Sequence, residues 1–328
     1  MLRILKNIWP YALTLILLLA GCGKGIQKKE RSPLEQWMVQ NDKLKVLSTT
    51  AMIDDLVAKI GGENIDHLSL IIGEIDPHSY ELVKGDDEKF IRADILFYNG
   101  LGLEHGASLR YRIDHHPNAV ALGDVVCRLK PEEILYRGGQ IDPHIWMDIA
   151  LWSEIVDPIV EVLSKALPET AEVFAANGRA LKNELLLIHK QITQQIKSVP
   201  AEKRFLVTSH DAFNYFTRAY LSKDNEEDWR ERFKAPEGLA PEGQISPEDI
   251  RSVIDHLVQY QVTRVFPESN VSRDALRKIV EACRSRGLLV DIAEKPLHGD
   301  AMGPPGSITD SYIQMMQHNA NVLEEAWR

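Results

Sequence analysis

The sequence has few cysteines, and they form no metal-binding pair motif. Only Cys22, Cys127 and Cys283 occur in 328 residues, and no Cys-x-x-Cys is present. A thiolate metal site is therefore not expected. Cys127 and Cys283 stand 156 positions apart in ordinary sequence, which is more typical of two separate buried thiols than of a disulfide.

Other absences exclude whole classes of function. The chain has no Gly-x-x-x-x-Gly-Lys-[Ser/Thr] loop and no apolar run of membrane-spanning length after Cys22, so it is neither a P-loop ATPase nor a permease. It carries 38 Lys and Arg against 48 Asp and Glu, a net charge of -10, which argues against nucleic acid as the main partner. The zinc-hydrolase motif His-Glu-x-x-His is also absent.

The N-terminus has the pattern of a secretory signal. Arg3 and Lys6 supply positive charge, and the apolar run that follows is too short to span a bilayer comfortably. It ends in Leu19-Ala20-Gly21-Cys22, which resembles the lipobox of bacterial lipoproteins, where the cysteine becomes lipidated. The alternative is a plain secretory signal cut nearby. We expect a protein outside the cytoplasm, periplasmic or on the cell surface, anchored to the membrane by lipid at Cys22.

The sequence predicts an α/β fold with two lobes. Residues 1–22 are expected to be the signal peptide and lipobox, and residues 23–44, rich in polar residues, a flexible tether. Apolar strands then alternate with helices, which predicts in each lobe a mainly parallel sheet with helices on both faces. The expected N-terminal elements are strands at 45–50, 67–72, 95–98 and 119–122 and helices near 53–60, 88–93 and 148–167.

A long helix is predicted between the lobes. Apolar residues recur at helical spacing from Glu169 to about Ser198, so we divide the chain into an N-terminal lobe at 45–167, a rigid interdomain helix at 168–199 and a C-terminal lobe at 200–328. The polar stretch Ser222 to Gly243 could cap an opening, but we interpret it as solvated surface. The expected C-terminal elements are strands at 204–208, 263–266 and 288–292 and helices at 212–219, 247–261, 272–286 and 310–327.

One short motif occurs twice, as Asp76-Pro77-His78 and Asp142-Pro143-His144. Proline restricts itself and the residue before it, while the aspartate can close a turn onto backbone donors. Each histidine should therefore stand on a stiff corner. Two ordinary surface turns would explain the motifs equally well if each occurred alone.

Four side chains lie in loops after predicted strands, namely His78, His144, His210 and Asp300. Ligands of open α/β sheets collect at the carboxyl ends of strands, so these loops can converge between the lobes. Three imidazoles and one carboxylate suit a divalent transition metal, with Zn preferring four ligands and Mn accepting more. His298 has a similar setting and could replace or assist Asp300, although a solvated loop histidine is the preferred interpretation.

Glu268 and Asp211 are candidates for a supporting role. A carboxylate often accepts the free ring N–H of a metal-bound histidine, and Asp211 stands beside His210. For both residues, solvent exposure or helix capping is the preferred interpretation.

Several motifs together resemble a known family. The chain is similar, in order and spacing, to the TroA-like metal-binding lipoproteins of ABC importers. The resemblance implies two lobes joined by one long helix, a metal cargo bound by His78, His144, His210 and Asp300, and delivery to a membrane permease with its cytoplasmic ATPase. The motifs are Asp76-Pro77-His78, Asn99-Gly100-Leu101-Gly102-Leu103-Glu104, Asp142-Pro143-His144-Ile145-Trp146-Met147-Asp148, Thr208-Ser209-His210-Asp211-Ala212-Phe213, Phe266-Pro267-Glu268-Ser269-Asn270 and Asp300-Ala301-Met302-Gly303.

The departures from the family pattern leave the metal open among Zn, Mn and Fe. Manganese-dedicated members often have a glutamate where this chain has His210, and zinc-dedicated members often have a long His-rich loop that this chain lacks. The stretch Ser222 to Gly243 resembles the chlamydial branch, where iron has been considered as cargo. At equilibrium such a site favours Zn over Mn or Fe.

The function expected from the sequence is thus a monomeric, non-enzymatic binding protein that carries a metal to an ABC permease. A zinc-dependent hydrolase is the alternative from another class, since it too uses His and carboxylate ligands. A surface adhesin is a further alternative, drawn from family members that are described that way.

Overall fold

The structure is a computed structural model that describes residues 32–223, 226–241 and 245–328. The chain divides into Met1–Gln36 and a compact unit, Trp37–Arg328, whose fold is described below. The predicted signal peptide and lipobox, with Cys22, lie outside the described residues, as do residues 23–31 of the predicted tether. The rest of that stretch is not all flexible linker, because it contains the helix α2 (Pro33–Trp37), and Trp37 is buried. In the part of the chain that the structure describes, no helix has the length and apolar character needed to cross a membrane.

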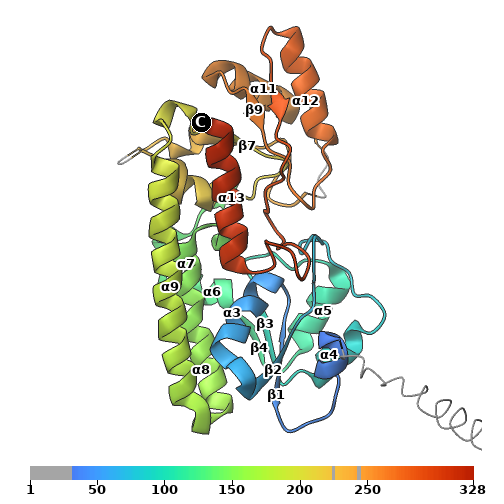
Figure 1. The fold of residues 1–328 in the computed structure, drawn as a ribbon. Coiled ribbons are helices and arrows are strands. Elements are labelled where there is room, and N and C mark those ends of the chain that lie inside the picture. Colours follow the sequence, from blue (N-terminus) through green and yellow to red (C-terminus); the bar gives the residue numbers. More distant parts are fainter. Residues whose placement is uncertain (1–31, 224–225, 242–244) are drawn as a thin grey trace, which may run out of the picture. The chain divides into compact units, whose positions relative to one another are not determined.

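The N-terminal lobe contains a four-stranded parallel sheet (Figure 1). Its strands are β1 (Leu44–Ser48), β2 (Ile65–Ser69), β3 (Ile95–Tyr98) and β4 (Ala119–Ala121), in the order β2-β1-β3-β4. Successive side chains of a strand point to opposite faces, so both faces of a buried sheet need cover. Val46 and Phe97 lie in one hydrophobic cluster, whereas Leu47 and Leu96 lie in another.

Helices supply that cover on both faces. α3 (Ala51–Gly61) and α6 (Leu122–Leu129) contribute to the first cluster, and α4 (Asp86–Arg92) and α5 (Ala107–His115) contribute to the second. The strand at 95–98 was predicted with its observed bounds, but α5 and α6 were not predicted. β2 begins two residues earlier than expected, because Ile65 pairs with Leu44 at the start of β1.

The C-terminal lobe has short parallel strands. β7 (Leu206–Val207) pairs with β8 (Phe233–Lys234), and β9 (Arg264–Val265) pairs with β10 (Asp291–Ile292). The Phe266 N–H donates to Val207 O at 2.8 Å, which connects the two pairs. α11 (Pro247–Tyr260) and α12 (Asp274–Ser285) pack on one face, while Leu206 and Phe266 belong to the cluster on the other. The predicted α/β class with parallel sheets is confirmed.

Two helices connect the lobes. α9 (Ala171–Lys197) follows α7 (Ile149–Trp152) and α8 (Val156–Ala166), and at ~1.5 Å per residue its 27 residues reach about 40 Å. α13 (Tyr312–Trp327) lies beside α9 (Figure 1), and the Tyr312 N–H donates to Asp55 of α3. The long helix was predicted, whereas the second connection was not. The lobe boundaries at 167 and 199 stay a prediction.

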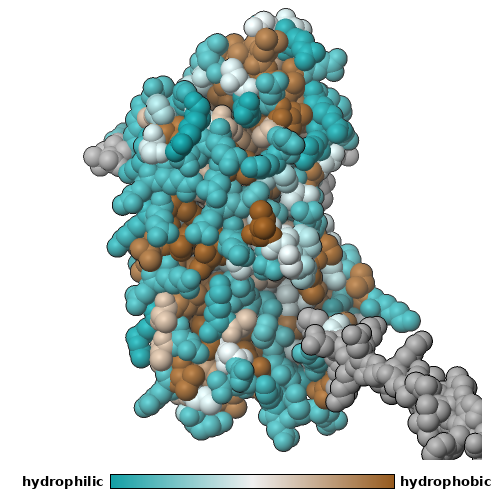
Figure 2. Space-filling model, viewed as in Figure 1, coloured by the Kyte–Doolittle hydropathy of each residue, from teal (hydrophilic) through white to brown (hydrophobic). Residues whose placement is uncertain are grey.

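The main hydrophobic cluster is continuous from one lobe to the other. It contains Val46 and Phe97 of the first sheet, Phe266 of the C-terminal lobe and Trp327 of α13. The face shown in Figure 2 is mostly hydrophilic with scattered hydrophobic patches. Leu187 of α9 is one of the exposed apolar side chains of the protein. A shared core of this kind favours movement of the lobes as one body.

The stretch Ser222 to Gly243 differs from the predicted solvated loop. Among its described residues it forms the 3₁₀-helix Trp229–Arg232 and strand β8, and Arg232 and Phe233 are buried. The Arg232 guanidinium donates to Glu226 and to the carbonyl oxygen of Ala201, which allows a cation to be buried. The prediction of plain surface was therefore wrong for the part that completes the second sheet.

Two short elements also differ from the prediction. The predicted helix 212–219 is divided into α10 (Asn214–Phe216) and a π-helix, Thr217–Leu221. An unpredicted antiparallel hairpin joins β5 (Tyr136–Arg137) to β6 (Gln140–Ile141). Both Cys127 and Cys283 are free thiols in contact with different hydrophobic clusters, but Cys283 is buried and Cys127 only partly so.

Tyr215 of α10 connects the lobes by hydrogen bonds. Its buried hydroxyl accepts from the Leu135 N–H at 2.9 Å and donates to the Asp142 carbonyl oxygen at 3.0 Å. We expect Tyr215→Phe to lower the free energy of unfolding by about 1–3 kcal/mol, because two buried backbone groups lose their partner. Urea denaturation would measure this, with Tyr136→Phe as the exposed control, and equal midpoints for both variants would contradict it.

Candidate metal centre

The two Asp-Pro-His motifs form the expected corners. The carboxylate of Asp76 accepts from the His78 N–H at 2.9 Å, and that of Asp142 accepts from the His144 N–H at 3.0 Å. Each aspartate thus closes a turn onto the residue two positions later. Both histidines are buried. The shared local sequence therefore produces the same backbone device twice.

The four candidate loops approach the site from both lobes. His78 follows β2, His210 follows β7 and Asp300 follows β10, as the strand-end prediction requires. His144 is different, because it follows β6 of the antiparallel hairpin and precedes a 3₁₀-helix, Ile145–Met147. The expectation that all four loops follow strands of the parallel sheets was therefore wrong for His144.

One donor atom from each of the four side chains lies within 4.8 Å of all the others. Nε2 of His78 lies 3.2 Å from Nε2 of His144. The Asp300 carboxylate lies between the rings, with Oδ1 3.3 Å from His144 Nε2 and Oδ2 2.9 Å from His210 Nε2. All four side chains are buried. Three ring nitrogens and both carboxylate oxygens thus converge on one small volume.

The converging atoms lack ordinary hydrogen-bond partners. Among the described residues, Nε2 of His210 and both carboxylate oxygens of Asp300 are buried and contact no polar group outside the cluster, because their contacts are with one another and with the rings of His78 and His144. Buried polar atoms without partners are rare in folded proteins, since each costs free energy. Three such atoms at one point fit a site shaped for a cation, and three nitrogens with one carboxylate suit Zn, Mn or Fe.

Two further carboxylates hold the outer nitrogens of the rings. Asp142 Oδ1 lies 2.6 Å from His144 Nδ1, and Glu268 Oε2 lies 2.7 Å from His210 Nδ1. Glu268 Oε1 also accepts from the backbone N–H groups of Ser209 and His210, both at 2.9 Å. Such partners orient an imidazole and leave Nε2 as the nitrogen that faces a metal.

The structure corrects the preferred interpretation of both supporting candidates. Glu268 is buried against His210, not exposed to solvent. Asp211 is also buried, but its carboxylate contacts Arg137 and Asn214, and the ring of His210 contacts Glu268. Sequence reasoning missed Asp142 as a ring partner, although Asp142 belongs to the motif that places His144.

The charges of the site depend on one another. Burial lowers the pKa of His144, but the carboxyl groups of Asp142 and Asp300 outweigh burial and raise that pKa to about 9. Burial likewise opposes the charge of His210, yet Asp300 and Glu268 raise its pKa well above the usual value. Burial raises the pKa of Asp300, whereas His210 and His144 lower it well below its usual range. The three carboxylates therefore favour positive charge on the rings of His144 and His210.

His298 lies apart from the cluster. Its Nδ1 lies 3.1 Å from the Ala301 carbonyl oxygen and 3.2 Å from Ser269 Oγ, and the side chain is buried, not solvated as predicted. Burial and the neighbouring His318 lower its pKa to about 4. The set of converging donors among the described residues is complete without it.

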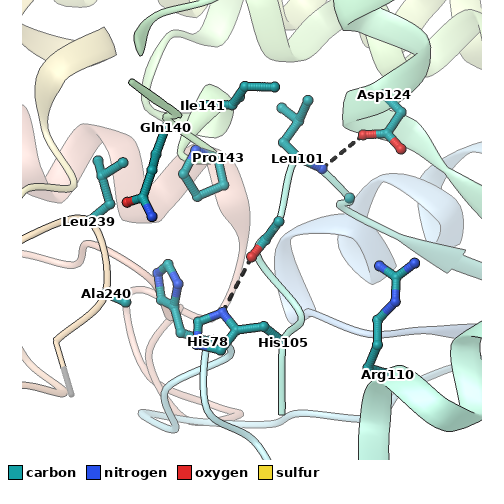
Figure 3. Close-up of a pocket in the computed structure, with 12 residues that line it drawn as sticks. His78, Leu101, His105, Arg110, Asp124, Gln140, Ile141, Pro143, Leu239 and Ala240 are labelled. Atoms are coloured by element: carbon teal, nitrogen blue, oxygen red, sulfur yellow. Dashed lines mark hydrogen bonds between the residues drawn. The ribbon is translucent and has the colours of Figure 1, made fainter. Parts of the chain in front are cut away.

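A hollow of about 750 Å³ adjoins His78 (Figure 3). The rings of His78 and His105 lie side by side on it, with their centroids 5.8 Å apart. Leu239 and Ala240 of the C-terminal lobe also line it. Part of the stretch Ser222 to Gly243 thus borders the hollow beside the cluster. This agrees with the alternative interpretation, in which the stretch caps an opening.

Comparison with known proteins relates this geometry to a family. A family model described as ZnuA, zinc-uptake complex component A periplasmic, matches residues 46–326. The metal-binding protein YtgA of Chlamydia pneumoniae is 40% identical over 288 residues, which cover 87% of this chain and 86% of the relative. The manganese-binding lipoprotein MntA of Bacillus subtilis is 32% identical over 312 residues, with 94% of each chain covered.

A solved structure agrees with the sequence relatives. The crystal structure of Fe(III)-bound YtgA from Chlamydia trachomatis has a TM-score of 0.81 and 38% identity, covering 87% of this chain and 98% of that chain. The resemblance to TroA-like proteins is thereby confirmed. These relatives are named for metal binding and metal uptake, which favours the binding function over the hydrolase alternative. The chain belongs to the ZnuA family of periplasmic components of zinc-uptake complexes.

Proposed function

We propose that this protein captures one transition-metal ion through His78, His144, His210 and Asp300 and delivers it to an ABC permease. The observation that carries the proposal is the convergence of four buried donor atoms within 4.8 Å. Bringing imidazoles and a carboxylate together in a dry interior costs free energy, which a bound cation offsets. The metal is cargo here and takes no part in a reaction.

The donor set supports zinc, manganese or iron as cargo. Three imidazoles and one carboxylate complete a tetrahedral zinc shell, and two available oxygens of Asp300 allow a larger coordination number. The family description names zinc, the Bacillus relative is named for manganese and the chlamydial structure holds Fe(III). We propose that the site prefers zinc at equilibrium, and that availability and release rates decide the ion carried in the cell.

The complete burial of the donors also supports binding over catalysis. A catalytic zinc usually has three protein ligands and keeps a position open for water. Here four protein groups surround the centre and all are buried. Surface adhesion has no support of its own in this geometry, and we do not propose it.

Delivery requires partners that the chain does not supply. We propose an ABC permease with its cytoplasmic ATPase as partners, a lipid anchor at Cys22 and a monomeric binding protein. The lobes are connected by α9, α13 and the shared core, so we propose that release involves a small movement of the lobes.

Removal of a proposed ligand should abolish tight binding. We expect His144→Ala and Asp300→Ala each to weaken zinc binding by more than about 100-fold, beyond the 10–100-fold typical of residues that only support a ligand. Competition titration against a coloured chelator would measure the affinity. The control is His115→Ala, an exposed histidine of α5. Native mass spectra in which both ligand variants keep stoichiometric metal would contradict the assignment.

Gly299, directly before Asp300, has no space for a side chain. An added Cβ would lie 2.3 Å from Glu268 Oε2 and 3.2 Å from His210 Cε1, so the ligand loop would have to shift. We expect Gly299→Ala to weaken zinc binding at least about tenfold, as for other disturbed supports of a ligand. Gly238→Ala is the matched control, because its Cβ would meet open space. Equal zinc affinities in the two variants would show that the loop adapts.

The connections between the lobes predict a modest change of shape on binding. The Trp146 Nε1–H donates to Gly299 O at 2.8 Å, and the Tyr312 hydroxyl donates to Trp146 O at 2.7 Å. We expect X-ray scattering profiles of chelator-treated and zinc-loaded protein to superimpose closely. A wide swing of one lobe, seen as a clear increase in the radius of gyration without metal, would rule this out.

A further inference from the structure

The exposed hairpin β5–β6 directly precedes the proposed ligand His144 in the chain. Its tip, Gly138 and Gly139, has φ values of 56° and 84°, which suit a two-residue turn of type I′. Arg137, next to the tip, is 46% exposed. Its Nε nevertheless lies 2.8 Å from Oδ2 of buried Asp211, a residue of the other lobe. One end of this ion pair is therefore at the surface and the other is inside the protein.

A continuous series of contacts leads from that ion pair to His144. Asn214 Nδ2 donates to Asp211 Oδ1 at 3.1 Å and to Asp142 Oδ2 at 2.9 Å. The other oxygen of Asp142 lies 2.6 Å from His144 Nδ1. Four contacts thus connect a surface arginine with the ring of a proposed ligand, and the series crosses between the lobes twice.

The neighbours of Asn214 determine which way its side-chain amide is oriented. The groups around Nδ2 are Asp142 Oδ2, Asp211 Oδ1 and the Asp211 carbonyl oxygen, and all of them are acceptors. Asn214 must therefore present its NH₂ group to both carboxylates. This amide holds two buried carboxylates at fixed positions, while Arg137 holds Asp211 from the outer side.

We propose that Arg137, Asp211 and Asn214 are positioning residues that set the orientation of the His144 ring through Asp142. The inference rests on the proposed function, because His144 must be a ligand for its orientation to matter. Partners that orient a ligand imidazole typically contribute 10–100-fold to metal affinity. A change at the surface of the hairpin should therefore alter the affinity of the site for metal.

The first test is zinc affinity in the full chain, measured by competition with a coloured chelator. We expect Asn214→Leu, which keeps the branched shape of the side chain and removes the amide, to weaken binding about tenfold. Arg137→Ala should weaken it less, about threefold, because Arg137 lies two contacts further from His144 than Asn214 does. Arg137→Lys should restore the affinity, since it keeps a cation beside Asp211.

The matched control is Arg286→Ala. Arg286 is 43% exposed and is also paired with an aspartate, but that partner, Asp255, lies at the surface. Its removal should leave the zinc affinity unchanged. A further variant, Asp142→Asn, should remove the effect of Arg137, so the double variant should bind zinc no more weakly than Asp142→Asn alone.

The second test uses the metal-free protein and is independent of affinity. The Nδ1–H proton of His144, held at Asp142, can be followed by NMR. Its resonance should shift in Arg137→Ala and Asn214→Leu and stay in place in Arg286→Ala, while the urea midpoint of Arg137→Ala stays close to that of the unmodified protein. A purely structural role for Arg137 would instead lower the midpoint and leave the resonance unmoved.

The possible failures are distinguishable. If the unmodified protein binds no zinc, manganese or iron, the proposed function is wrong. If it binds metal and Arg137→Ala changes neither the affinity nor the His144 resonance, the inference of positioning residues is wrong and the ligand assignment stands. If Asn214→Leu does not fold, Arg137→Ala and Arg137→Lys decide alone, since both change only a half-exposed side chain.

Discussion

The structure depends on bringing three imidazoles and one carboxylate together as buried side chains. Each of these groups is stable in water, and burial without partners is costly for all of them. The protein meets this cost with further carboxylates at Asp142 and Glu268, which hold the outer nitrogens of His144 and His210. The inner ring nitrogens and the oxygens of Asp300 then face one another, and such a group of atoms suits a cation.

This requirement explains why the lobes are held together so firmly. His78 and His144 come from one lobe and His210 and Asp300 from the other, so the donor atoms meet only if the lobes keep a defined relation. Two helices, a continuous hydrophobic cluster and the hydrogen bonds of Tyr215, Trp146 and Tyr312 maintain it. These contacts hold the two lobes in the relation that the proposed site requires.

Much of the fold was accessible from sequence because it follows from local rules. Alternating apolar strands and helices predicted the α/β class, and the proline corners predicted the turns at His78 and His144. The hairpin β5–β6, the π-helix Thr217–Leu221 and strand β8 were missed. These elements are too short to produce periodicity, and packing against the rest of the chain stabilises them.

The sequence by itself determined which side chains could bind a metal and on which turns they stand, because a turn depends on neighbouring residues. Only the tertiary structure decided which carboxylate supports which ring. Asp211 stands beside His210 in sequence yet holds Arg137 and Asn214, while Glu268, 58 residues away, contacts His210. Contacts between residues so far apart depend on how the two lobes pack, and no local pattern encodes that arrangement.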